Sequence, residues 1–161
     1  PGLVTAKAEV GYNQAAIFVK KGNPKGVPAD LSAFTDDGFR PIIGSAERGS
    51  IGKETKKILT KFGNYDQVKE KATITSHSQS LVNAIKADKA DVSINWYAVS
   101  TWKENLEGIE TLRISEAFAA KKKLVLTVLS DSKHPGQAKA FLDFVASEKG
   151  HAVFKQYGLA D

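Results

Sequence analysis

Residues 41–63 combine a short apolar strand, a loop of small residues and a basic amphipathic helix, and this succession limits the possible folds more than any other segment. The loop 44–52 contains three glycines, two serines and one alanine, and the predicted helix 53–62 closes at Gly63. Backbone amides in such a loop approach a ligand closely and open onto the positive end of a helix. The segment is therefore a candidate anion site, and an ordinary strand-to-helix turn is the alternative.

Composition bounds the class of protein. A length of 161 residues suits one domain or two small lobes, and 42% hydrophobic with 25% charged residues is typical of globular proteins. The chain has no cysteine, which excludes disulfides, thiolate zinc sites and cysteine nucleophiles. The net charge of +5 favours anionic ligands. The densest basic cluster, residues 121–123, has no aromatic neighbours interleaved, so nucleic-acid binding is not expected.

Strand-like and helix-like patterns alternate along the chain, which predicts α/β units and a largely parallel sheet. In such sheets, ligands bind beyond the carboxyl ends of the strands. Three such ends are predicted, at residues 45–51, 76–80 and 95–97. The predicted strands are residues 15–19, 40–43, 72–75, 90–97, 111–114 and 123–129, and the predicted helices are 53–62, 79–87, 135–145 and 148–157.

The predicted helices carry recognisable start signals and apolar stripes. Residues 76–79 have the spacing of a capping box, and Ser147 is placed to cap the last helix. Each stripe recurs at helical spacing, so its side chains are expected to face the core. The expected inward residues are Leu81, Val82 and Ile85 on one helix and Phe141, Leu142 and Val145 on another.

The candidate ligand-binding residues lie at the three predicted strand ends, and each has a structural alternative. Arg48 is suited to clamping an oxyanion, or it is a solvated loop residue. The serines there either donate to an anion or cap helices, and capping is favoured for Ser50. The aromatic residues there either line a pocket or pack beneath a loop. The set comprises Ser45, Arg48, Ser50, Ile51, Ser78, Asn95, Trp96 and Tyr97.

Signatures of catalysis are missing from the sequence. The three histidines, at positions 77, 134 and 151, have no ligand spacing with one another or with a carboxylate. No G-x-S-x-G elbow and no phosphate-binding P-loop pattern is present. The residues therefore indicate a binding protein rather than an enzyme, with no metal and no cofactor expected.

Several segments resemble the molybdate-binding branch of the type 2 periplasmic solute-binding proteins. Residues 44–63 are similar to its strand-loop-helix, and Ala-Asp-Val-Ser-Ile-Asn-Trp at 90–96 is a variant of its "GeADaGIVY" strand. The most specific match is the ending at 141–159, which looks like the family's "F…FL.S..gq.iF.kyGF". Residues 15–24 are similar to the strand that crosses between lobes and the "pkgNP" loop after it.

The resemblance implies an α/β fold of the type 2 periplasmic-binding-protein kind, with a Rossmann-like mixed sheet flanked by helices. It also implies a non-catalytic ligand trap, periplasmic or extracellular and membrane-associated, that delivers a small anion to the membrane permease of an ABC transporter. About the first third of the family pattern has no counterpart, so we expect one complete lobe with hinge strands. The expected divisions are residues 1–24 (crossing strand region), 25–115 (second lobe) and 116–161 (return strand and C-terminal helices).

The resemblance also carries ligand contacts to particular positions. The family's alanine amide falls at Ile51, and the amide at the next helix start falls near Ser78. The family's tyrosine hydroxyl falls at Trp96, with Tyr97 one place on, and its proline before the alanine is replaced by Ser50. An indole in place of a phenol weakens the case for molybdate and favours a larger or organic anion.

Two other functions remain open from the sequence: the effector-binding domain of a LysR-type transcription regulator, and an enzyme on a similar fold. We also expect self-association. The crossing strand at 17–19 and the side chains of Phe141, Phe144, Phe154 and Tyr157 are expected to present an apolar surface that another copy of the chain covers.

Overall fold

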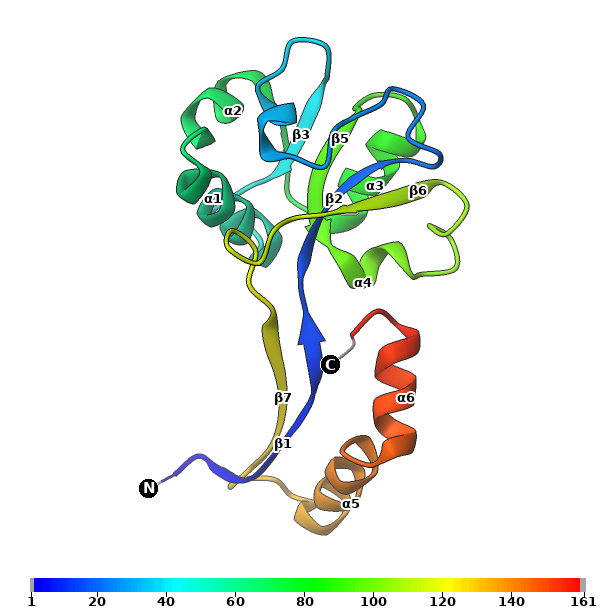
Figure 1. Cartoon of the computed structure of the whole chain (residues 1–161). Coiled ribbons are helices and arrows are strands. Elements are labelled where there is room, and N and C mark those ends of the chain that lie inside the picture. Colours follow the sequence, from blue (N-terminus) through cyan, green and yellow to red (C-terminus); the bar gives the residue numbers. More distant parts are fainter. Residues whose placement is uncertain (1, 160–161) are drawn as a thin grey trace. The chain divides into compact units, whose positions relative to one another are not determined.

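The computed structural model describes residues 2–159 and divides the chain into two compact units (Figure 1). Unit 1 comprises residues 1–13 and 122–161, and unit 2 comprises residues 14–121. The boundaries therefore fall at 13/14 and 121/122, whereas the sequence analysis placed the divisions at 24/25 and 115/116. The strand after residue 14 pairs with β5 and β6, both of which belong to unit 2.

Unit 2 is built on a five-stranded sheet of order β4-β3-β5-β2-β6. The β3–β4 and β3–β5 pairs are parallel, whereas β2 is antiparallel to both β5 and β6. The mixed sheet implied by the family resemblance is thus confirmed, and the largely parallel sheet predicted from the alternation is wrong. The strands are β2 (Ala15–Lys20), β3 (Pro41–Gly44), β4 (Thr73–Thr75), β5 (Val92–Trp96) and β6 (Ile109–Arg113).

Helices flank this sheet (Figure 1). Successive residues of β2 and β5 are buried on both sides of the strand, which requires that both faces of the sheet are covered. The predicted inward stripe of α3 is confirmed, because Leu81, Val82 and Ile85 are fully buried. The helices of unit 2 are η1 (Leu31–Phe34), α1 (Ser50–Phe62), α2 (Tyr65–Lys71), α3 (Ser78–Lys86) and α4 (Tyr97–Ser100).

Strand β2 occupies the interior of the sheet, which corrects one expectation. The side chains of Ile17, Phe18 and Val19 are at most 1% exposed, and β5 and β6 pair with the strand on its two sides. From the sequence, this segment was expected to present an apolar surface that another copy of the chain covers. It is instead one of the most buried elements of the chain.

A charged cluster joins three segments at the start of β5. Asp91 is 5% exposed, and its carboxylate accepts a bond at 2.9 Å from Arg40 Nε and another at 2.8 Å from Arg40 Nη2. Lys25 Nζ lies 3.1 Å from the same carboxylate. The hydrogen bonds from Arg40 hold the pKa of Asp91 well below its usual range. The carboxylate therefore stays ionised. It ties the start of β5 to the start of β3 through Arg40 and to the 22–26 loop through Lys25.

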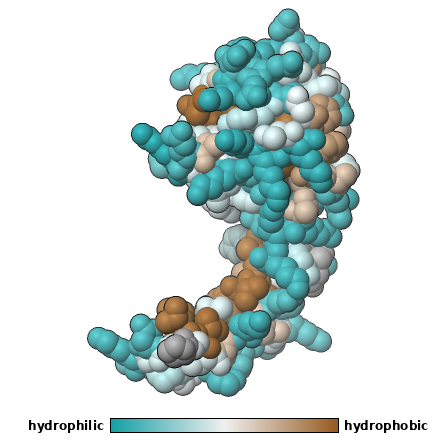
Figure 2. All heavy atoms as spheres, turned by 90° about the vertical axis from the view of Figure 1, so that its left-hand side faces the viewer, coloured by the Kyte–Doolittle hydropathy of each residue, from teal (hydrophilic) through white to brown (hydrophobic). Residues whose placement is uncertain are grey.

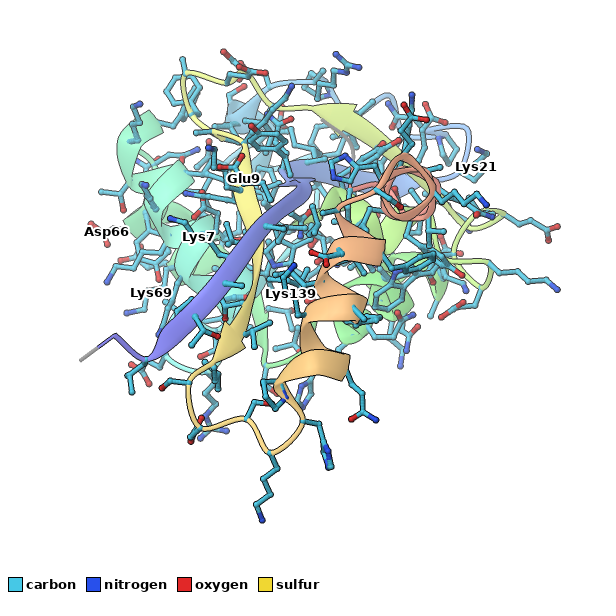
Figure 3. The ribbon with its side chains drawn as sticks, turned by 90° about the horizontal axis from the view of Figure 1, so that it is seen from below. Lys7, Glu9, Lys21, Asp66, Lys69 and Lys139 are labelled. Atoms are coloured by element: carbon cyan, nitrogen blue, oxygen red, sulfur yellow. The ribbon has the colours of Figure 1, made fainter. Side chains whose placement is uncertain are left out.

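Unit 1 is a two-stranded antiparallel ribbon covered on one face by two helices. Its small core contains Val10, Val128, Leu142 and Val145. The alternate side chains of the ribbon lie outside, and Figure 3 shows Lys7 and Glu9 on β1, where Glu9 pairs with Lys123 at 2.6 Å. The elements are β1 (Val4–Asn13), β7 (Lys122–Leu129), α5 (Pro135–Val145) and α6 (Glu148–Gln156).

The stripe predicted for α5 is partly wrong. Leu142 and Val145 are buried, but Phe141 is 58% exposed. Residue 141 is turned about 100° from residue 142 around the helix axis. Leu142 therefore packs against the ribbon, whereas Phe141 points away from it. Phe144 and Tyr157 are also exposed, and Figure 2 shows hydrophobic residues on the surface of this unit. The predicted cap of α6 is confirmed, since Ser147 Oγ accepts from Gly150 N.

Candidate anion-binding site

Three loops of unit 2 meet where the parallel strands β3, β4 and β5 end. The carboxyl ends of parallel strands share one edge of a sheet, so the segments that follow them are neighbours. Ser45 N, directly after β3, donates to Thr75 O at the end of β4, at 2.7 Å. Trp96, the last residue of β5, reaches the start of α1, where its Nε1 donates to Ser50 Oγ at 3.2 Å. The structure therefore brings together the three strand ends that the sequence analysis selected.

Helix α1 begins with free backbone donors. Gly49 is its N-cap, and the first helical bond runs from Lys53 N to Gly49 O at 3.1 Å. The amides of Ser50, Ile51 and Gly52 precede that bond, and no group among residues 2–159 accepts from them. Ser50 is the first helical residue rather than the cap, so the prediction that it caps the helix is wrong.

Helix α3 begins in the same way. Its N-cap is His77, and no side chain within the described residues caps the helix, so the predicted capping box is wrong. The first bond is from Ser80 N to His77 O, at 3.1 Å, and no group among residues 2–159 accepts from the amides of Ser78 and Gln79. Neither α1 nor α3 has an acidic residue in its first turn, whereas α6 has both a serine cap and Glu148. Two uncompensated positive helix ends thus lie side by side.

A chain of hydrogen bonds links these two helix starts through the end of β5. Asn95 Nδ2 donates to Ser78 O at 3.0 Å, and Asn95 Oδ1 accepts from Trp96 N at 2.9 Å. The Trp96 indole continues the chain to Ser50. Asn95 is fully buried, and both the nitrogen and the oxygen of its side-chain amide are engaged in these hydrogen bonds. Its position indicates that it aligns the helix starts rather than contacting a ligand.

The remaining candidates lie around this meeting point. Arg48 is exposed, and no acceptor within residues 2–159 binds its guanidinium. Ser45 Oγ accepts from Glu47 N at 3.4 Å, which is a contact within the loop. Tyr97, the first residue of α4, is 43% exposed. The site is therefore rich in donors and carries aromatic surface beside them.

Close backbone packing sets the position of α1. A Cβ atom added to Gly52 would lie 1.9 Å from Ser45 O and 2.8 Å from Gly44 C. Only glycine fits there, because the first turn of the helix rests directly on the end of β3. This contact fixes the direction in which the free amides point.

Comparison with known proteins assigns the chain to a family. The model of the family described as bacterial extracellular solute-binding protein matches residues 1–160. The chain belongs to this family of solute-binding proteins. A Bacillus subtilis protein named as an ABC transporter substrate-binding lipoprotein, YvgL, is 23% identical over 142 residues, covering 84% of this chain. The chain spans 52% of the length of that relative.

Solved structures share the fold of this solute-binding protein. One is described as the substrate-binding domain of a molybdenum ABC transporter from Clostridium difficile, with a TM-score of 0.80 and 21% identity, over 97% of this chain and 67% of that one. PEB3 with bound L-phospholactate has a TM-score of 0.78 and 17% identity, over 96% and 68% of the two chains. The periplasmic molybdate-binding protein of Azotobacter vinelandii has a TM-score of 0.73 and 12% identity, over 99% and 71%. At these identities the likeness shows the fold.

A cavity of about 200 Å³ lies at the start of β5, away from the candidate site. It is lined by the end of β2, by residues of the 23–27 loop and by residues 88–91, which join α3 to β5. Its charged groups pair with one another, Lys20 with Asp88 at 2.6 Å and Lys25 with Asp91 at 3.1 Å. It therefore offers no unpaired charge comparable with Arg48.

Within residues 2–159, no three His, Asp or Glu side chains gather in a way that could hold a metal ion. None of the helices in this range is both long enough and apolar enough to cross a membrane.

Proposed function

We propose that this chain is the ligand-capturing part of an extracytoplasmic ABC importer and that unit 2 binds a small anion where α1 and α3 begin. The proposed contacts are the amides of Ile51 and Ser78, the hydroxyl of Ser50 and the guanidinium of Arg48. Asn95 positions the two helices, and Trp96 and Tyr97 border the site. Ser45 shapes the loop.

One observation carries this proposal: two adjacent helices begin with free amides and with neither a side-chain cap nor an acidic residue. A helix start of this kind favours a negative charge. Two of them, joined through Asn95 and Trp96, present donors from different directions. The structural neighbours support an anion, because they include molybdate-binding and sulfate-binding proteins and PEB3 with bound L-phospholactate, although one is a thiamin-binding protein.

The family supports capture without catalysis and delivery to a permease. The matching model describes solute-binding proteins, and the Bacillus subtilis relative is named as a substrate-binding lipoprotein of an ABC transporter. We therefore propose that the chain works outside the cytoplasm, in the periplasm or at the outer side of a membrane. On this account, the anion leaves the protein chemically unchanged.

Replacing Arg48 by alanine tests the site. We expect the affinity for the tightest-binding anion, among sulfate, molybdate, phosphate and small organic phosphates, to fall by about 10-fold to 100-fold in calorimetric titrations. Arg48→Lys is the matched control, because it keeps the charge and loses the planar fork, and its affinity should be intermediate. Since the guanidinium is exposed, neither change should alter the melting temperature. An unchanged affinity in Arg48→Ala would place the site elsewhere.

We also propose that unit 1 self-associates. Phe141, Phe144, Val153 and Tyr157 expose large apolar surfaces, and within residues 2–159 β1 and β7 pair only with each other, which leaves open edges. Light scattering should therefore show a mass that rises with concentration. The double variant Phe141→Ser/Tyr157→Ser should reduce the rise, and a monomer at every concentration would contradict the proposal.

A further inference from the structure

Two aromatic residues beside the helix starts, the partly buried Trp96 and the exposed Tyr97, constrain the chemistry of the ligand beyond its charge. Trp96 is partly buried against the core, and its only polar atom, Nε1, is already used in the bond to Ser50. The part of the indole that remains exposed therefore offers no donor and presents only apolar surface. A bare inorganic oxyanion, whose oxygens need donors on every side, gains nothing from that surface.

The bond from Trp96 also fixes the role of the Ser50 hydroxyl. Because Ser50 Oγ accepts from the indole, its own hydrogen is left to donate. The hydroxyl thus joins the amides of Ile51 and Gly52 as a third donor at the start of α1. The indole lies directly beside these donors, since one hydrogen bond joins it to the first helical residue. A ligand held by the donors is therefore in reach of the aromatic ring.

We propose that the ligand is a small organic anion, whose phosphoryl or carboxylate head binds at the starts of α1 and α3 and whose carbon skeleton covers Trp96. This inference rests on the proposed function, because it takes the same site as given and adds the class of ligand. Trp96 is then the residue that determines specificity, and the exposed ring of Tyr97 borders the space for the carbon skeleton.

The test compares anions that differ only in their carbon part. The 161-residue chain is titrated at pH 8 with sulfate, molybdate and phosphate, and with methyl phosphate, propyl phosphate, acetate and butyrate. Calorimetry gives the affinities. The chain has two tryptophans, so a Trp102→Phe background leaves Trp96 as the single indole, and its fluorescence reports contact with the carbon part. The melting temperature of each variant checks that it is folded.

We expect propyl phosphate to bind about tenfold more tightly than inorganic phosphate and to change the Trp96 fluorescence. Trp96→Ala should abolish this preference, so that propyl phosphate and inorganic phosphate bind with equal affinity. Trp96→Phe, which keeps an aromatic ring, should retain most of the preference. Equal or tighter binding of the inorganic anions, or a preference that survives in Trp96→Ala, would overturn the inference and leave the anion site itself intact. Binding of no anion would overturn both the inference and the proposed function.

Discussion

Gly52→Ala is expected to destabilise unit 2 by about 3 kcal/mol and to abolish anion binding, because the added methyl group has no room. Its Cβ would lie 1.9 Å from Ser45 O and 2.3 Å from Ser45 C, both of which belong to the backbone. Either the first turn of α1 or the end of β3 must therefore move. Chemical denaturation followed by circular dichroism measures the stability, and calorimetry at a temperature where the variant remains folded measures the binding.

Gly136→Ala is the matched control for this prediction. Gly136 is also in the first turn of a helix, and apart from its chain neighbours and the backbone of its own helix, no atom of residues 2–159 lies within 4 Å of an added Cβ there. Since alanine favours helix over glycine by up to about 1 kcal/mol, this variant should be as stable as the parent chain or slightly more stable. Full stability and unaltered binding in Gly52→Ala would show that α1 does not rest on β3 as described.

Phe18→Ala is expected to lower the free energy of unfolding by about 3–5 kcal/mol, because it removes a fully buried aromatic side chain from the central part of the sheet. Phe18 lies on β2, with β5 on one side and β6 on the other. The remaining cavity cannot collapse easily between two strands and their covering helices. Urea denaturation gives the change in stability.

Phe141→Ala provides the comparison, because it removes the same side chain from a position that is 58% exposed. Its loss of stability should stay below about 1 kcal/mol. If the two substitutions cost the same, or if Phe141→Ala is the more damaging, then β2 is not the interior strand that the structure shows. The pair therefore tests whether β2 is buried in the interior of the sheet.

Much of the fold was predictable because periodicity and turn chemistry are local. The helices that start at Pro135 and after Ser147, and the apolar stripe of α3, follow from patterns within about ten residues. Three elements were not predicted: β1, α2 and α4. β1 has alternating alanines and charges with few large apolar side chains, and it is held as a strand by its ladder to β7, about 115 residues away. Because the partner strand is so far away in sequence, the residue pattern of β1 alone does not indicate a strand.

The candidate site shows the same limit. The three loops were identified from strand ends, but the roles of individual residues depend on atoms that come from other loops. Ser50 looks like a helix cap in sequence, yet Gly49 is the N-cap, and the Ser50 hydroxyl instead meets an indole from β5. Asn95 was predicted to contact the ligand, yet it is fully buried and its side-chain amide hydrogen-bonds to Ser78 and to Trp96. Gly52 lies in the loop 44–52, whose amides were expected to approach a ligand, but the free amide of Gln79 was not predicted, because an amide has no signal in the side-chain pattern.

The central claim, an anion held by the free amides of α1 and α3, is tested most directly by amide chemical shifts during a titration. In a ¹⁵N–¹H correlation spectrum, addition of methyl phosphate should shift the amides of Ile51, Gly52, Ser78 and Gln79 most strongly, with one common dissociation constant. The shifts should be absent when sodium chloride at equal ionic strength is added instead. Largest shifts around Asn23 and Lys25, beside the cavity at the start of β5, or no saturable shifts at all, would contradict the account.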